Sequence, residues 1–116
     1  MMNINPIIES KGEVVDITSQ VTPVAAYVKD IYVVRSENVV SVSIGTYPNT
    51  PPSGQSITIA TGLPKPYLTS YGVSLFGNGR NGDGFARVNT NGSVDVYNGS
   101  DAVGGMAVSI TYITNE

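Results

Sequence analysis

The sequence of 116 residues contains no cysteine and no histidine. Without cysteine there is no disulfide framework, no thiolate nucleophile and no zinc site of the cysteine type. Without histidine the chain lacks the commonest general base and the commonest metal ligand in proteins. Catalysis by a Ser-His-Asp triad and ordinary zinc chemistry are therefore excluded, and we expect neither a metal nor a cofactor.

Charge is also scarce, and it is slightly negative. Six Lys and Arg residues stand against nine Asp and Glu residues, which gives a net charge of −3. The basic residues are scattered singly and form no stripe of the kind that nucleic-acid binding requires, so we expect no nucleic-acid partner. No apolar run approaches 18 residues, so we expect no membrane insertion.

Apolar residues instead recur with a period of two, among many Val, Ile, Thr, Ser, Tyr and Gly residues. This pattern is typical of short, half-buried strands and predicts an all-β protein. Pro- and Gly-rich segments separate the strands, and the spacing favours a sandwich or a small Greek-key or jelly-roll-like barrel. The predicted strands are Val14–Thr18, Val24–Tyr27, Ile31–Ser36, Val39–Gly45, Gln55–Ala60, Tyr71–Phe76, Phe85–Asn89, Ser93–Tyr97 and Met106–Thr114.

The stretch "FARVNTNGSVDVY", Phe85 to Tyr97, predicts a β-hairpin whose register depends on its turn. A two-residue turn at Asn91-Gly92 would mix apolar and charged residues on each face. A three-residue loop, Thr90-Asn91-Gly92, makes one face wholly apolar and puts Gly92 where a left-handed residue is required. We therefore predict the three-residue loop. It pairs Val88 with Val94, Ala86 with Val96, Arg87 with Asp95 and Phe85 with Tyr97.

Residues Ile31 to Val34 break the alternation, because they put apolar groups on both faces of one strand. Such a strand must be covered twice, either by a second sheet or by another subunit. Both possibilities stay open at this point. Residues 1–20 are interpreted as a connector or the end of an upstream neck, and residues 21–116 as a single domain.

The order of motifs from residue 61 to residue 97 resembles a known family. A Gly-Leu-Pro-x-x-Tyr segment is followed by a strand, a Gly-rich loop, "ARVNTNG" and "SVDVY". This arrangement is similar to the C-terminal head domains of phage receptor-binding proteins, most of all those of siphophages that infect Lactococcus. The resemblance covers Val21 to Glu116, and Thr61–Tyr97 is its most specific part.

The resemblance implies a non-catalytic adhesion module at the tail tip or baseplate of a virion, joined to upstream neck and baseplate domains. It implies a homotrimer that binds host cell-wall polysaccharide, with or without phosphate substituents, in an outer-surface crevice between subunits. Family crevices often use Trp and His beside Asp and Arg. This chain has neither Trp nor His, so its aromatic platform would have to be Phe or Tyr.

The predicted hairpin offers a candidate saccharide site on its outer face. Aromatic rings stack on the apolar faces of sugars, and planar Asp and Arg groups span adjacent hydroxyls. The alternative is a solvated face with a cross-strand ion pair and a cross-strand aromatic pair. The nearby loop "GNGRNGDG" adds one basic and one acidic residue, and its single carboxylate is too little charge for calcium. The predicted saccharide-binding residues are Phe85, Arg87, Asp95, Tyr97, Arg80 and Asp83.

Two other functions compete with saccharide binding. The first is a structural trimerising tip or decoration domain whose outer face binds nothing, since β-sandwiches serve both purposes. The second is a glycan depolymerase, which needs two carboxylates about 5–10 Å apart. Asp83 and Asp95 are the pair that could meet this requirement. We expect no enzymatic activity, because depolymerases are generally much larger domains with deep grooves.

Overall fold

A computed structural model of the chain describes residues 13–46, 52, 54–76, 84–98 and 106–116. These residues form nine strands and one short 3-10 helix, and none of them forms a helix long and apolar enough to cross a membrane. The all-β prediction is confirmed. The strands are β1 (Val15–Asp16), β2 (Thr22–Pro23), β3 (Val28–Ser36), β4 (Val39–Thr46), β5 (Gln55–Thr61), β6 (Ser70–Phe76), β7 (Phe85–Val88), β8 (Val94–Asn98) and β9 (Met106–Ile113); the helix is η1 (Thr18–Gln20).

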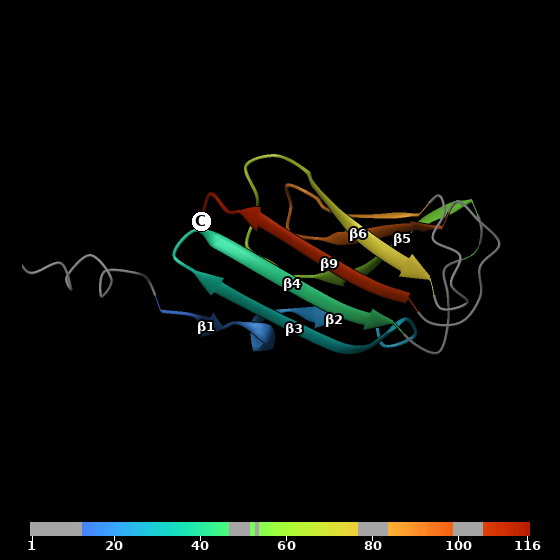
Figure 1. Cartoon of the computed structure of the whole chain (residues 1–116), viewed down its shortest axis with the longest axis horizontal. Coiled ribbons are helices and arrows are strands. Elements are labelled where there is room, and N and C mark those ends of the chain that lie inside the picture. The colour runs from blue at the N-terminus through green and yellow to red at the C-terminus, as the bar shows by residue number, and fades with distance from the viewer. Residues whose placement is uncertain (1–12, 47–51, 53, 77–83, 99–105) are drawn as a thin grey trace, which may run out of the picture.

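The strands form two antiparallel sheets that pack face to face as a sandwich (Figure 1). Sheet A has the order β1-β3-β4-β9-β6, and sheet B has the order β6-β7-β8-β5-β2. Strand β6 belongs to both sheets. Its first residues, 70–72, pair with β7, and residues 73–76 pair with β9.

Gly72 lies where β6 passes from sheet B to sheet A. A Cβ atom at this position would collide with the side chain of Ile110 and with the carbonyl oxygen of Ser109. Only glycine therefore lets β6 approach β9 closely enough to change sheets, as is common at the corners of closed β-structures.

The core lies between the sheets and is made of alternate strand residues. Sheet A contributes Val33, Val40 and Ile110, each at most 2% exposed. Sheet B contributes Val88 and Val96, which are fully buried. Burying an aliphatic side chain of this size stabilises the fold by about 1.5–3 kcal/mol. The period-two pattern of the sequence thus gives each sheet one apolar face.

The predicted hairpin register is confirmed. Strand β7 pairs with β8 with Val88 opposite Val94, Ala86 opposite Val96, Arg87 opposite Asp95, and Phe85 opposite Tyr97. Gly92 has φ = 87°, the left-handed conformation that the three-residue loop requires. All four apolar hairpin residues are fully buried.

Two expectations near the N-terminus differ from the structure. The prediction of a strand at Val24–Tyr27 is wrong. The chain turns there, with the amides of Tyr27 and Val28 donating to the carbonyl of Val24, and the strand lies earlier, at Thr22–Pro23. The packed unit also includes residues 15–20, which the sequence assigned to the connector, because β1 pairs with β3 and Ile17 is buried in the core.

The strand with apolar residues on both faces is β3. Val33 is fully buried, and Ile31 packs partly against the core. Tyr32 and Val34 lie on the outer face of sheet A, where Tyr32 is 55% exposed. The second sheet therefore covers one face of β3, and Tyr32 stays exposed on the other face.

Candidate functional site

The candidate site is the outer face of sheet B. Successive cross-strand pairs place Tyr71 opposite Arg87, Arg87 opposite Asp95, and Asp95 opposite Thr58. A neighbouring pair places Phe85 opposite Tyr97. These side chains point outward because the residues between them along β7 and β8 are buried. We call this set the sheet B surface: Thr58, Tyr71, Phe85, Arg87, Asp95 and Tyr97.

Three aromatic rings stand side by side on this surface. The ring of Phe85 stacks on Tyr97, with centroids 5.3 Å apart and an interplanar angle of 27°. It also meets Tyr71 in an edge arrangement at 5.7 Å and 65°. Phe85 is therefore partly covered by its neighbours, whereas Tyr71 is 64% exposed. Tyr71 is the ring with most surface available to a ligand.

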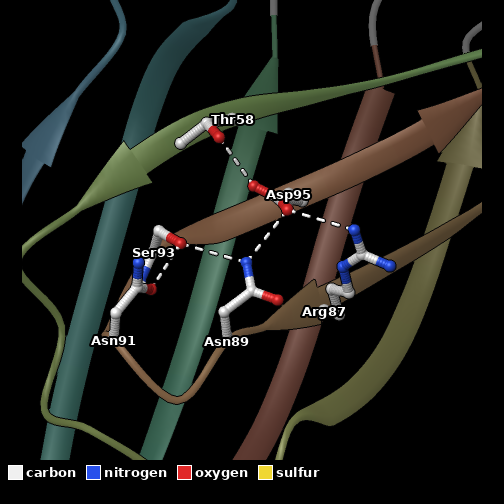
Figure 2. Close-up of polar contacts among 6 residues, drawn as sticks. All are labelled: Thr58, Arg87, Asn89, Asn91, Ser93 and Asp95. Atoms are coloured by element: carbon white, nitrogen blue, oxygen red, sulfur yellow. Dashed lines mark hydrogen bonds and ion pairs between the residues drawn. The ribbon is translucent and has the colours of Figure 1, made fainter.

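The polar part of the surface is organised by Asp95 (Figure 2). Its Oδ1 accepts a 2.7 Å hydrogen bond from the hydroxyl of Thr58. Its Oδ2 accepts hydrogen bonds from Nδ2 of Asn89 at 2.9 Å and from Nη2 of Arg87 at 3.3 Å. We call these four residues the Asp95 network. It joins strand β5 to both strands of the hairpin.

The hairpin turn supports this network from one end. Nδ2 of Asn89 also donates to the hydroxyl of Ser93, which in turn contacts Oδ1 of Asn91 (Figure 2). The backbone amide of Ser93 donates to the same oxygen of Asn91 at 3.0 Å. Local side-chain bonds of this kind fix the conformation of a turn. The Asn89 amide is thus held in place before it reaches Asp95.

Arg87 keeps donors that the described contacts do not use. Its guanidinium carbon lies 5.9 Å from the centroid of the Phe85 ring, and its side chain is 29% exposed. The buried Nε has no hydrogen-bond partner among the described residues. Since a guanidinium carries five N–H donors and no acceptor, the Nη groups have donors left for an acceptor from outside.

The sequence-predicted site residues are brought together only in part. One row contains four of them: Phe85, Arg87, Asp95 and Tyr97. The register had suggested that this row faces solvent. Its residues are half-buried instead, because their rings and charged groups pack on one another. Arg80 and Asp83 lie outside the described residues. The depolymerase pair Asp83 and Asp95 therefore has no described geometry. Among the residues that are described, no cluster of three acidic groups could hold a metal ion.

The sequence did not indicate three residues that take part here: Tyr71 and Thr58 of the sheet B surface, and Asn89 of the Asp95 network. Tyr71 joins the row because β6 pairs with β7, and that pairing crosses the Gly-rich segment after Phe76. Thr58 joins it because β5 pairs with β8, 37 positions further along the chain. Asn89 carried the one available signal, since it follows β7 directly and Asn side chains bond readily to nearby groups at turns.

A Pro-rich turn before β6 is fixed by the C-terminal residues. The carbonyl oxygen of Lys65 accepts hydrogen bonds from the Thr114 hydroxyl at 2.8 Å and from the Asn115 amide at 2.9 Å. The amide of Lys65 donates to Oε1 of Glu116 at 3.0 Å. Tyr67, which follows, is 66% exposed. These contacts fix the backbone of the turn on both sides of Lys65.

A second surface feature lies on the outer face of sheet A. It is an open hollow of about 410 Å³ with Gly45 and Ala107 among its lining residues and Tyr32 at one side. Ser43 and Ser109 face each other across β4 and β9 within it. The residues of β4 and β9 that line the hollow on this face have small side chains, so the hollow is open to solvent.

Comparisons with protein-family models, with curated proteins and with solved structures found no match for this chain.

Proposed function

We propose that the sheet B surface binds saccharide and that the chain is a non-catalytic adhesion domain. The observation that carries the proposal is the pairing of the exposed ring of Tyr71 with the guanidinium of Arg87, which Asp95 holds from the other side. An aromatic face accommodates the C–H-rich face of a sugar, and a guanidinium donates to neighbouring hydroxyl oxygens. Both demands of sugar binding meet on adjacent strands.

The biological setting that we propose is the head domain of a phage receptor-binding protein. Its ligand is host cell-wall polysaccharide, and phosphate substituents on that polymer would be favoured by the charge of Arg87. Support comes from the motif order of residues 61–97 and from the sandwich fold. The domain would sit at the tail tip or baseplate of the virion, after a neck.

Binding at one such surface is expected to be weak. Polar sugar sites exchange water for nearly equivalent hydrogen bonds, so little net free energy is gained per site. Several copies on one particle would raise the effective local concentration and make attachment tight. This mode of action needs assembly and requires no chemical step.

We propose that assembly uses the outer face of sheet A and gives a homotrimer. Tyr32 and Val34 are apolar groups on an open face, and the small residues of β4 and β9 beside them permit close approach of another chain. Covering this face would complete the burial of β3. Light scattering should give three times the monomer mass of 12.2 kDa. A monomer at micromolar concentration would contradict the trimer.

The second candidate function is a structural tip, and the same open face of sheet A favours it. In that case the face mediates assembly while the sheet B surface binds nothing. The half-buried ion pair of Arg87 and Asp95 would then be an ordinary cross-strand contact. The two functions share a fold and differ in whether a glycan is bound.

A panel of immobilised bacterial cell-wall polysaccharides separates these functions. We expect the wild-type protein to bind a subset of the panel and to leave the bound polymers intact, as judged by their size after incubation. Absence of binding across the panel would favour the structural tip. Shortening of a polymer would identify a depolymerase and overturn the adhesion proposal.

A further inference from the structure

Asp95 has little capacity left for a ligand. An ionised carboxylate offers about four lone-pair positions. Three of them accept hydrogen bonds from Thr58, Asn89 and Arg87, and the Asp95 side chain is only 16% exposed. A sugar hydroxyl that donated to Asp95 would have to displace one of these contacts.

We propose that Asp95 is a positioning residue that holds Arg87 for the ligand and does not bind the ligand itself. This inference rests on the proposed saccharide binding at the sheet B surface. It separates the residues that contact the ligand from the residues of the Asp95 network that support Arg87. Tyr71 and Arg87 touch the sugar, whereas Asp95, Asn89 and Thr58 fix the guanidinium from behind.

The geometry of Arg87 explains why such a support is needed. Only one of its nitrogens, Nη2, bonds to Asp95, at 3.3 Å, and its Nε has no partner among the described residues. A long side chain with a single anchor would lose much rotational freedom on binding a sugar. Fixing the anchor beforehand lowers that entropic cost.

The support comes from elements that do not depend on the ligand. Thr58 lies on β5 and Asn89 at the end of β7, so Asp95 is fixed from two sides before Arg87 is added. The Asn89 amide is itself held by Ser93. Loss of Thr58 or Asn89 should therefore act on binding through Arg87 alone.

These separate roles predict which chemical groups of the ligand lie beside Arg87. Because Arg87 is only a donor, the ligand atoms beside it are acceptors, such as hydroxyl, ring or acidic oxygens. If the ligand instead donated its hydroxyl groups to Asp95, Asp95→Asn would lower its affinity whether or not Arg87 were present. This difference is measurable.

The test is a double-mutant cycle on the polysaccharide that wild-type protein binds most tightly in the panel. Dissociation constants are measured by NMR titration for wild type, Arg87→Ala, Asp95→Asn and the double variant. We expect Asp95→Asn to weaken binding on the order of tenfold in the wild-type background. In the Arg87→Ala background its further effect should be under about twofold.

Two further variants keep the test informative if Asp95→Asn folds poorly. Thr58→Val and Asn89→Ala each remove one support of Asp95 and should weaken binding about two- to fivefold, again only when Arg87 is present. Asp16→Asn is the matched control, since Asp16 accepts a hydrogen bond from the Thr18 amide away from this surface. The control should leave binding unchanged.

The Arg87 Nε–H resonance of the free protein supplies a readout that general destabilisation does not move. We expect it to shift in Asp95→Asn, Thr58→Val and Asn89→Ala, and to stay in place in Asp16→Asn. The positioning role would be overturned, while the proposed function stands, if Asp95→Asn lowered the affinity equally with and without Arg87. An Arg87 resonance that is unchanged in Asp95→Asn would overturn it as well. No binding by the wild-type protein would overturn both.

Discussion

The hydroxyl group of Tyr112 donates a 2.7 Å hydrogen bond to the carbonyl oxygen of Pro64 inside the fold. Tyr112 lies near the end of β9 and is 4% exposed. The bond joins the last long strand to the Pro-rich turn that precedes β6. Since β6 carries Tyr71, the position of this turn affects where the sheet B surface begins.

Replacing Tyr112 with Phe should destabilise the protein by about 1–3 kcal/mol, because the buried carbonyl of Pro64 loses its hydrogen-bond donor. Chemical denaturation followed by circular dichroism measures the change. Tyr67→Phe is the matched control, since its hydroxyl belongs to a side chain that is 66% exposed. Equal stabilities of the Tyr112 and Tyr67 variants would contradict a role for this bond.

Stability should fall at alkaline pH, in part because of Tyr112. Burial raises the pKa of its phenol above the ordinary value of about 10. Above that pH the unfolded chain releases the proton while the folded chain keeps it, so the free energy of unfolding decreases as pH rises. The stability difference between wild type and Tyr112→Phe should narrow from pH 10 to pH 11.5. A constant difference would show that Tyr112 titrates alike in both states.

Gly72→Ala should be among the most damaging single substitutions in the chain. A methyl group there meets Ile110 and the backbone of Ser109, and backbone cannot move aside cheaply. Overpacking of this kind costs typically about 1–3 kcal/mol or more. Wild type is the reference in this comparison. A Gly72→Ala protein with the melting temperature of wild type would refute the close approach of β6 and β9.

The hairpin register makes a prediction about its core and its turn. Val88→Ala should cost about 1–3 kcal/mol, since Val88 is fully buried and the substitution leaves a cavity. Gly92→Val should cost about as much, because φ is 87° and a Cβ atom would collide with the carbonyl oxygen of Leu63. Thermal unfolding measures both. A Gly92→Val protein as stable as wild type would contradict the left-handed turn.

The sequence predicted the hairpin because two independent signals agree there. The alternation of Val88, Val94 and Val96 with polar residues fixes which face is buried, and Gly92 fixes the loop length. The run Val24–Tyr27 carried no turn residue to contradict a strand, yet the chain turns there because the Val24 carbonyl accepts two backbone bonds. Local apolar composition was misleading at that point.

The candidate site could be predicted only as far as local pairing reaches. Arg87 and Asp95 are eight residues apart in one hairpin, so their contact follows from the register. Thr58 and Tyr71 come from strands whose order in the sheet is decided by tertiary packing. Nor does a register show how many hydrogen bonds a carboxylate accepts, so the three that Asp95 accepts follow only from the tertiary structure.

Titration of matched variants with wall polysaccharide shows whether the sheet B surface is the saccharide site. Tyr71→Ala and Arg87→Ala are compared with Tyr67→Ala, whose ring is as exposed, and with Glu37→Gln, an exposed charge. Arg87→Ala should also destabilise the fold by about 1 kcal/mol, since its ion pair is half-buried, so all variants are titrated below their unfolding transitions. We expect Tyr71→Ala and Arg87→Ala to lose at least about tenfold in affinity for wall polysaccharide while the two controls bind as wild type does. Wild-type affinity in Tyr71→Ala and Arg87→Ala, or a loss confined to Tyr67→Ala, would contradict saccharide binding at this surface.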